Sequence, residues 1–151
     1  MSKVFEIPYK IRFSECDSTG LVFHSHFFKW AVDTEEEFFL SNCGTQVFGP
    51  GAAGGYYTPM AGVRAEFISP LRAGDYVTFQ LWIEKLGWSS IRWGFVILKD
   101  GKTAIKIAET LVFTKIEPDG SFKAAEIPSA FREAMLPYVK EPGVPGMAFR
   151  S

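Results

Sequence analysis

The chain has 151 residues, of which 47% are hydrophobic and 16% aromatic, and its 16 Lys and Arg against 17 Asp and Glu leave a formal net charge of -1. So much apolar surface excludes an intrinsically disordered chain, and balanced charge without a long run of one sign excludes sequence-independent nucleic-acid binding, which depends on many phosphate contacts. The amino terminus lacks the apolar core of a signal peptide and no apolar run reaches membrane-spanning length, so we expect no membrane segment.

The two cysteines, Cys16 and Cys43, have neither metal-ligand spacing nor the density of a disulfide-stapled secreted protein. We therefore expect reduced thiols in a cytoplasmic protein and no metal site. A chain of this length buries a core without staples, so we expect one domain over residues 1–140. The proline- and glycine-rich residues 141–151 are expected to form a loosely ordered tail.

An alternating apolar pattern from Phe5 to Phe13 predicts the first strand, and Pro8 within it indicates the edge of a sheet. Apolar residues then recur at spacings of three and four, which predicts a helix from Phe23 or Ser25 to Ser41. Ser25 is the expected N-cap and Gly44 the expected stop. The acidic residues Glu35 to Glu37 are expected to form a partly solvated helix face.

Four further strands are predicted by alternation over residues 61–67, 77–83, 91–97 and 105–113. Asp100-Gly101, the strongest short hairpin signal, joins the last two, so we expect the four to form one antiparallel meander. The glycine-rich residues 45–57 are expected to be a loop that either shapes a site or merely connects. Asp119-Gly120 predicts another turn, and residues 128–138 predict a short helix with Pro128 near its start.

The predicted elements are one strand, a long apolar helix and four antiparallel strands. If the sheet bends strongly around the helix, it buries both the apolar face of the strands and the apolar face of the helix. This α+β arrangement is the hotdog fold. Strand edges left open by one copy favour pairing with a second, so we expect a homodimer, and beyond it a dimer of dimers.

The loop between the first strand and the helix holds the candidate chemistry. Asp17 lies in a turn-forming segment, Gly20 permits a sharp bend, Phe23 supplies an apolar wall, and the helix beginning near His24 presents unpaired N–H groups. An acyl oxygen placed at that helix end would be polarised by backbone donors, and Asp17 on the other side of the carbonyl would act as nucleophile or as base for a water.

The stretch R-F-x-E-C-D-S-T-G-L-V-F-H-S-H-F-F-K-W, from Arg12 to Trp30, resembles the signature of the 4-hydroxybenzoyl-CoA thioesterase family of hotdog enzymes. The resemblance extends to Thr58-Pro59, Gly74-Asp75, the strand containing Glu109, and Glu126 to Pro128. It implies an acyl-CoA thioesterase that releases a carboxylic acid and CoA, without a cofactor because CoA belongs to the substrate.

Position by position, the resemblance implies that Asp17 is the catalytic carboxylate and that His24 carries the N–H that polarises the carbonyl. His26 receives no role. It also implies two binding sets: for substrate Gly20, Phe23, Thr58, Met60 and Gly62, and for CoA Arg64, Trp88, Ser89 and Ser90. Aromatic residues around the loop favour an aryl or a short- to medium-chain acyl group.

Two departures separate this chain from hydroxybenzoyl-CoA enzymes. Val32 stands where those enzymes have an acidic residue that reads the phenol, although Asp33 is adjacent, and the turn Leu86 to Ser90 lacks the basic cluster that holds CoA phosphates. The nearly uncharged turn motivates an alternative, a catalytically weak hotdog protein that binds acyl-CoA or a protein partner.

Three further alternatives have less support. A hydratase or dehydratase needs a histidine paired with an acid across the site, and no clear pair is present. Cys16 lacks an obvious histidine base. A helix glutamate serves as base in some hotdog enzymes, so Glu35 to Glu37 remain a minor alternative to Asp17.

Overall fold

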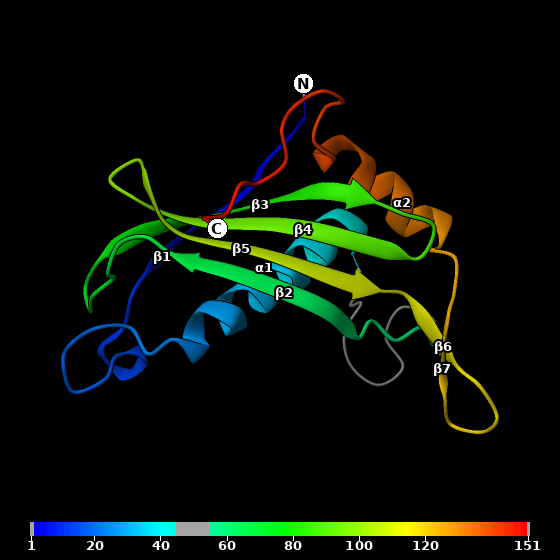
Figure 1. The fold of residues 1–151 in the computed structure, drawn as a ribbon, viewed down its shortest axis with the longest axis horizontal. Coiled ribbons are helices and arrows are strands. Elements are labelled where there is room, and N and C mark those ends of the chain that lie inside the picture. The colour runs from blue at the N-terminus through cyan, green and yellow to red at the C-terminus, as the bar shows by residue number, and fades with distance from the viewer. Residues whose placement is uncertain (1, 45–54, 151) are drawn as a thin grey trace.

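Five strands form one antiparallel sheet in the order β1-β3-β4-β5-β2, and the long helix α1 lies against one face of it (Figure 1). The computed structural model describes residues 2–44 and 55–150. The strands are β1 (Phe5–Lys10), β2 (Met60–Phe67), β3 (Tyr76–Leu86), β4 (Ser90–Lys99) and β5 (Lys102–Val112), and α1 is Ser25–Cys43. This is the predicted hotdog architecture.

The strands β3, β4 and β5 form the expected meander, and Asp100 and Gly101 turn the second hairpin with φ of 52° and 74°. The prediction that the preceding strand joins this meander is wrong. β2 pairs with β5 at the far edge, while β3 pairs with β1. Alternation reports which face of a strand is buried, but it carries no information about which strand lies alongside.

The helix α1 begins and ends close to the predicted positions. Gly44 closes it with φ of 66° and donates its N–H to the carbonyl of Leu40. The prediction of Ser25 as N-cap is wrong: His24 occupies that position with helical dihedrals, and no side chain in the described residues caps the helix. The first turn is instead closed from the preceding loop, because His26 donates its backbone N–H to the carbonyl of Phe23.

The edge strand β1 contains Pro8, as expected, but it stops at Lys10, three residues before the predicted end. Ile11 is buried, whereas Phe13 is 82% exposed and begins the short 3-10 helix η1 (Phe13–Glu15). The alternation therefore continues in the sequence for longer than the strand does in the fold.

The remaining elements close one end of the sheet. A small hairpin of β6 (Thr114–Ile116) and β7 (Phe122–Ala124) turns at Gly120, and the helices α2 (Ser129–Met135) and η3 (Leu136–Tyr138) follow. Pro128 is the N-cap of α2. No helix in the described part of the chain is long and apolar enough to cross a membrane.

Residues 141–150 contain no helix or strand and cross the outer face of the sheet, opposite α1 (Figure 1). Lys106 of β5 donates to the carbonyl of Ala148, and Arg150 pairs with Glu66 of β2 at 3.0 Å. These contacts fasten the tail across β5 to the edge strand.

Candidate active site

The loop between η1 and α1 is closed by its own backbone. Phe23 donates to the carbonyl of Glu15 at 2.9 Å, Asp17 donates to Leu21 at 2.9 Å, and Gly20 donates to Asp17 at 3.0 Å. Gly20 has φ of 81°, which side-chain-bearing residues resist. The loop is also tied to the segment after β2, because Val22 donates to Leu71 at 3.0 Å. Asp17, Gly20 and Phe23 therefore lie in one hydrogen-bonded loop, which leads directly into His24.

Asp17 is exposed, and one of its carboxylate oxygens is committed to the turn. Its Oδ1 accepts both the backbone N–H and the hydroxyl of Thr19, at 2.8 and 2.5 Å. These two hydrogen bonds hold the pKa of Asp17 below its ordinary value. A weaker hydrogen bond from the backbone of Leu21 lowers the pKa further, so the carboxylate is ionised at neutral pH while it remains exposed.

The N-terminus of α1 lies directly after this turn. Within the described ranges the backbone N–H of His24 has no acceptor, so it is an available donor at the positive end of a helix of 19 residues. Phe23 is 48% exposed and its ring lies 4.6 Å from the His24 ring. A carboxylate and an open helix N-terminus thus face solvent in the same short segment.

An apolar pocket of about 370 Å³ opens beside His24. Its walls come from α1, from the end of β2 and from the segment that follows β2, and its principal side chains are Phe27, Phe67, Ile68, Leu71 and Ile105. Of the predicted catalytic residues His24 lines it, and none of the residues predicted to bind substrate or CoA does.

The other predicted substrate residues lie at the opposite end of the sheet. Asp17 is near the start of β3, since Ile11 donates to the carbonyl of Asp75, whereas Thr58 and Met60 precede and begin β2 at its distant end (Figure 1). The eight residues of β2 span about 26 Å. One copy of the chain therefore does not bring Thr58, Met60 and Gly62 to Asp17.

The predicted CoA residues join this distant group. Ser89 accepts the N–H of Phe113 at 2.7 Å and Ser90 pairs with Val112, while Thr58 is flanked by residues bonded to Val112 and Thr114. Trp88 is 60% exposed. The sequence missed one neighbour, because Arg132 of α2 donates to the carbonyls of Gly87 and Trp88 at 2.7 and 3.2 Å. The uncharged turn thus has a guanidinium beside it.

Arg64 lies on the outer face of β2, where the tail engages it. Its guanidinium donates to the carbonyl of Arg150 at 3.1 Å and lies 4.9 Å from the centre of the Phe149 ring. Arg64 is separated from both the Asp17 loop and the turn at Ser89 by part of the length of β2.

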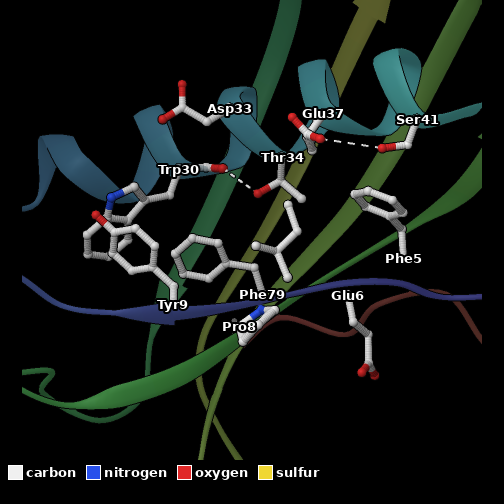
Figure 2. A pocket seen from close by; sticks show the side chains of 11 residues that line it. Phe5, Glu6, Pro8, Tyr9, Trp30, Asp33, Thr34, Glu37, Ser41 and Phe79 are labelled. Carbon is white, nitrogen blue, oxygen red and sulfur yellow. Dashed lines mark hydrogen bonds between the residues drawn. The ribbon is translucent and has the colours of Figure 1, made fainter. Parts of the chain in front are cut away.

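A second groove, of about 480 Å³, lies between α1 and the edge strand β1 (Figure 2). Of the residues considered for the site, only the alternatives Asp33 and Glu37 line it, and Asp17, His24 and the predicted substrate and CoA residues do not. Tyr9, Trp30 and Phe79 pack together in its floor, with Tyr9 stacked on Phe79 at 4.9 Å between ring centres. Tyr9 and Trp30 also donate hydrogen bonds to the carboxylate of Glu15.

The expectation of a solvated Glu35 is wrong. Glu35 of α1 is 0% exposed and Glu109 of β5 is 1% exposed. In the described part of the chain, no N–H or O–H group donates a hydrogen bond to either carboxyl group. Trp93, the cross-strand neighbour of Glu109, also has no acceptor there for its Nε1–H. Burial and the adjacent Glu109 carboxyl raise the pKa of Glu35 well above its ordinary value, and burial also raises the pKa of Glu109.

The remaining candidates carry no chemistry of their own. Cys16 donates its thiol to the carbonyl of Arg12 at 3.7 Å, and burial raises its pKa, so it is not a thiolate nucleophile at neutral pH. Across residues 2–44 and 55–150, no three His, Cys, Asp or Glu side chains are grouped as metal ligands.

Comparison with known proteins decides the family. The model of the Thioesterase superfamily matches residues 19–106, more than half of the chain. The chain belongs to the Thioesterase superfamily. The predicted family resemblance and enzyme class are confirmed, and the protein is a thioester hydrolase of the hotdog fold. The matched range begins after Asp17, so the comparison leaves the catalytic residues as predictions.

Individual relatives of this thioesterase agree on the fold. A 1,4-dihydroxy-2-naphthoyl-CoA hydrolase of Prochlorococcus marinus (strain MIT 9515) is 28% identical over 104 residues, covering 66% of this chain and 67% of the relative. The crystal structure of the dynemicin thioesterase matches with a TM-score of 0.81 and 17% identity over 92% of this chain and 99% of that one. A 1,4-dihydroxy-2-naphthoyl-CoA thioesterase from Synechocystis matches with a TM-score of 0.75 and 16% identity over 88% and 96%.

Proposed function

We propose that this thioesterase hydrolyses an aryl-CoA or a short- to medium-chain acyl-CoA, with Asp17 as nucleophile or general base and the backbone N–H of His24 as oxyanion donor. The observation that carries the proposal is that one closed loop holds both an exposed, ionised carboxylate and an open helix N-terminus. Histidine, cysteine and metal alternatives lack a comparable arrangement in the described residues.

The chemistry follows from these two groups. The His24 N–H and the helix dipole stabilise negative charge on the carbonyl oxygen as it becomes tetrahedral. As a base, Asp17 takes a proton from the attacking water; as a nucleophile, it attacks the carbonyl carbon and water then cleaves the resulting anhydride. In both routes the C–S bond breaks, CoA leaves as a thiolate that is protonated, and the acyl group becomes a carboxylic acid.

We further propose that two copies complete the site. β2 is an edge strand with an exposed row that includes Met60, Val63 and Phe67, at 43%, 48% and 49%. Antiparallel pairing of two such edges would place the Met60 end of one copy beside the Phe67 end of the other, which is the end near His24 and Asp17. Thr58, Met60 and Gly62 would then serve the partner's site.

The same pairing would also bring the predicted CoA-binding residues near the partner's Asp17 loop. Trp88, Ser89 and Ser90 lie at the Met60 end of the sheet, so a homodimer carries them toward the partner's loop, with Arg132 as an added cation. The pocket beside His24, about 370 Å³ and lined by Phe27 and Phe67, suits a flat apolar group. Two relatives named for a naphthoyl-CoA substrate favour an aryl group over an alkyl chain.

The decisive test is Asp17→Asn assayed by free-thiol release on a panel of aryl- and alkyl-CoA thioesters. We expect turnover of the best substrate to fall by about a hundredfold or more with unchanged folding, because the amide is neither base nor nucleophile. Asp119→Asn is the matched control, because Asp119 is an exposed carboxylate that accepts the same pair of hydrogen bonds, from the backbone and hydroxyl of Ser121. Near-normal turnover by the Asp17 variant would exclude the assignment.

The shared site predicts subunit complementation. Gly62 has open space where a Cβ would stand, so Gly62→Arg is expected to fold while obstructing the partner's site. Mixing inactive Asp17→Asn with inactive Gly62→Arg under subunit exchange should restore about a quarter of wild-type activity, since half of the dimers are mixed and each has one intact site. No recovery despite exchange would place the site within one copy.

A binding protein with weak catalysis is the second candidate, favoured by the absence of a basic cluster in the Leu86 to Ser90 turn. The same panel separates the two: binding of an acyl-CoA without hydrolysis of any member would support the binder.

A further inference from the structure

We propose that Glu15 is a positioning residue of this thioesterase, which holds the Asp17 turn and the start of α1 in register. The inference rests on the proposed function, because it concerns the geometry between Asp17 and His24. It assigns a role to a carboxylate that the catalytic chemistry itself does not use.

The Glu15 carboxylate joins three separate elements. Its Oε2 accepts the Tyr9 hydroxyl of β1 at 2.5 Å and Nε1–H of Trp30 of α1 at 3.0 Å. Its Oε1 accepts the backbone N–H of Arg12, at the start of η1, at 2.8 Å. One side chain therefore ties the strand, the 3-10 turn and the helix together.

The backbone of Glu15 transmits this position to the catalytic groups. Its carbonyl accepts the N–H of Phe23 at 2.9 Å, the outermost bond that closes the loop. Asp17 follows Glu15 by two residues, and His24 follows Phe23 by one. A shift of Glu15 therefore changes the separation between the Asp17 carboxylate and the His24 N–H, and errors of about 1 Å in such geometry cost up to about a hundredfold in rate.

The hydrogen bonds around Glu15 favour its ionised form. Burial raises its pKa, but the hydrogen bonds from Tyr9, Arg12 and Trp30 outweigh burial, and its net pKa lies below the ordinary value. Burial and the same contact with Glu15 raise the pKa of Tyr9 to about 12. At neutral pH an ionised acceptor thus faces three donors, the arrangement in which hydrogen bonds are strongest.

The two side-chain donors are themselves packed against other aromatic rings. Trp30 is 1% exposed, and Tyr9 packs on both Trp30 and Phe79, at 5.2 and 4.9 Å between ring centres (Figure 2). Glu15 is therefore anchored to the aromatic floor of the groove between α1 and β1, while its backbone reaches the exposed loop. The aromatic side chains in the floor of this groove thus hold Glu15, and through it the loop that contains Asp17.

Glu15→Gln tests the inference. It keeps the size of the side chain but removes the charge, and it replaces one accepting oxygen with an NH₂ group that cannot accept a hydrogen bond. We expect kcat to fall by about tenfold to a hundredfold with KM changed less than about threefold. Glu6→Gln, an exposed carboxylate that lines the same groove, is the control and should leave kcat unchanged. Unchanged kcat for Glu15→Gln would overturn the inference.

A merely structural role is separated by a double-mutant cycle. If Glu15 acts through Asp17, Glu15→Gln in the Asp17→Asn background should lower the residual rate by less than about twofold, and a full multiplicative loss would overturn the inference. Should Glu15→Gln fail to fold, Tyr9→Phe replaces it, because it removes one donor and keeps the stacked ring. Wild-type turnover by Asp17→Asn alone would instead overturn the proposed function.

Discussion

Replacing Glu35 by Gln should make the stability of the protein less dependent on pH. Glu35 and Glu109 are 0% and 1% exposed, and no cationic side chain of the described residues contributes to the pKa of either. No donor in that part of the chain reaches their oxygens, so a proton on one carboxyl group is the donor available to the other. The folded protein therefore retains at least one proton that the unfolded chain releases near the ordinary glutamate pKa.

The sign and size follow from linkage. A group whose pKa is raised by folding contributes stability below its unfolded pKa and loses it as pH rises toward the folded pKa. Each pH unit in that interval costs about 1.4 kcal/mol for each retained proton. Asp17, Glu66 and Asp119 have lowered pKa values, so their contributions are lost only in acid, below this interval. Cys16, Cys43 and Tyr9 have raised pKa values, but these groups titrate in base, so we assign the slope between pH 5 and pH 8 to the buried pair.

Urea unfolding from pH 5 to pH 8 measures this slope. We expect the wild-type unfolding free energy to fall with rising pH, and that of Glu35→Gln to fall less steeply, because the Gln amide gives Glu109 a donor without titrating. At the upper end the variant should be the more stable protein. Glu37→Gln, exposed on the same helix, should retain the wild-type slope. Parallel curves for wild type and Glu35→Gln would refute the shared proton.

Three further predictions concern packing, CoA and pH. Gly94→Ala should cost about 1–3 kcal/mol in urea unfolding, because its Cβ would stand 2.5 Å from the Trp82 ring, whereas Gly62→Ala meets nothing within 4 Å and should cost little. Arg132→Ala should raise KM for CoA thioesters severalfold and leave KM for short thioesters without the nucleotide unchanged. The pH profile of kcat/KM should show no Asp17 inflection between pH 5 and pH 8, because the lowered pKa keeps that carboxylate ionised there.

Local signals in the sequence predicted the elements, and the fold obeys them where the cause is local. Asp100-Gly101 turns a hairpin and Gly44 ends α1 because those positions require positive φ. The position of β2 in the strand order depends on which edge of the sheet the polypeptide reaches before it enters this strand. The sequence of residues 60–67 carries no information about that edge. The end of β1 was mispredicted for a similar reason. The apolar alternation continues to Phe13 in the sequence, but Phe13 already begins η1 in the structure.

The candidate site divides in the same way. The Asp17 to His24 loop is a contiguous segment with its own closing hydrogen bonds, and its composition predicted it. Thr58 and Ser89 lie at the other end of the sheet, so any contact with the Asp17 site would require the proposed second copy, which a single sequence does not place. Arg132 and Glu15 were missed because their contacts are tertiary: Arg132 reaches Gly87, and Glu15 reaches Trp30.

The contrast between the carboxyl groups narrows the choice of catalytic base. Glu35 lies on the helix where a hotdog base is one alternative, but it is fully buried and retains its proton as long as burial and Glu109 raise its pKa. A base must be both ionised and within reach of water, and Glu35 satisfies neither condition in the folded protein. Asp17 is exposed, ionised and next to the open end of α1. The two environments therefore distinguish a buried acid from an exposed, ionised carboxylate, and favour Asp17 as the proposed catalytic group.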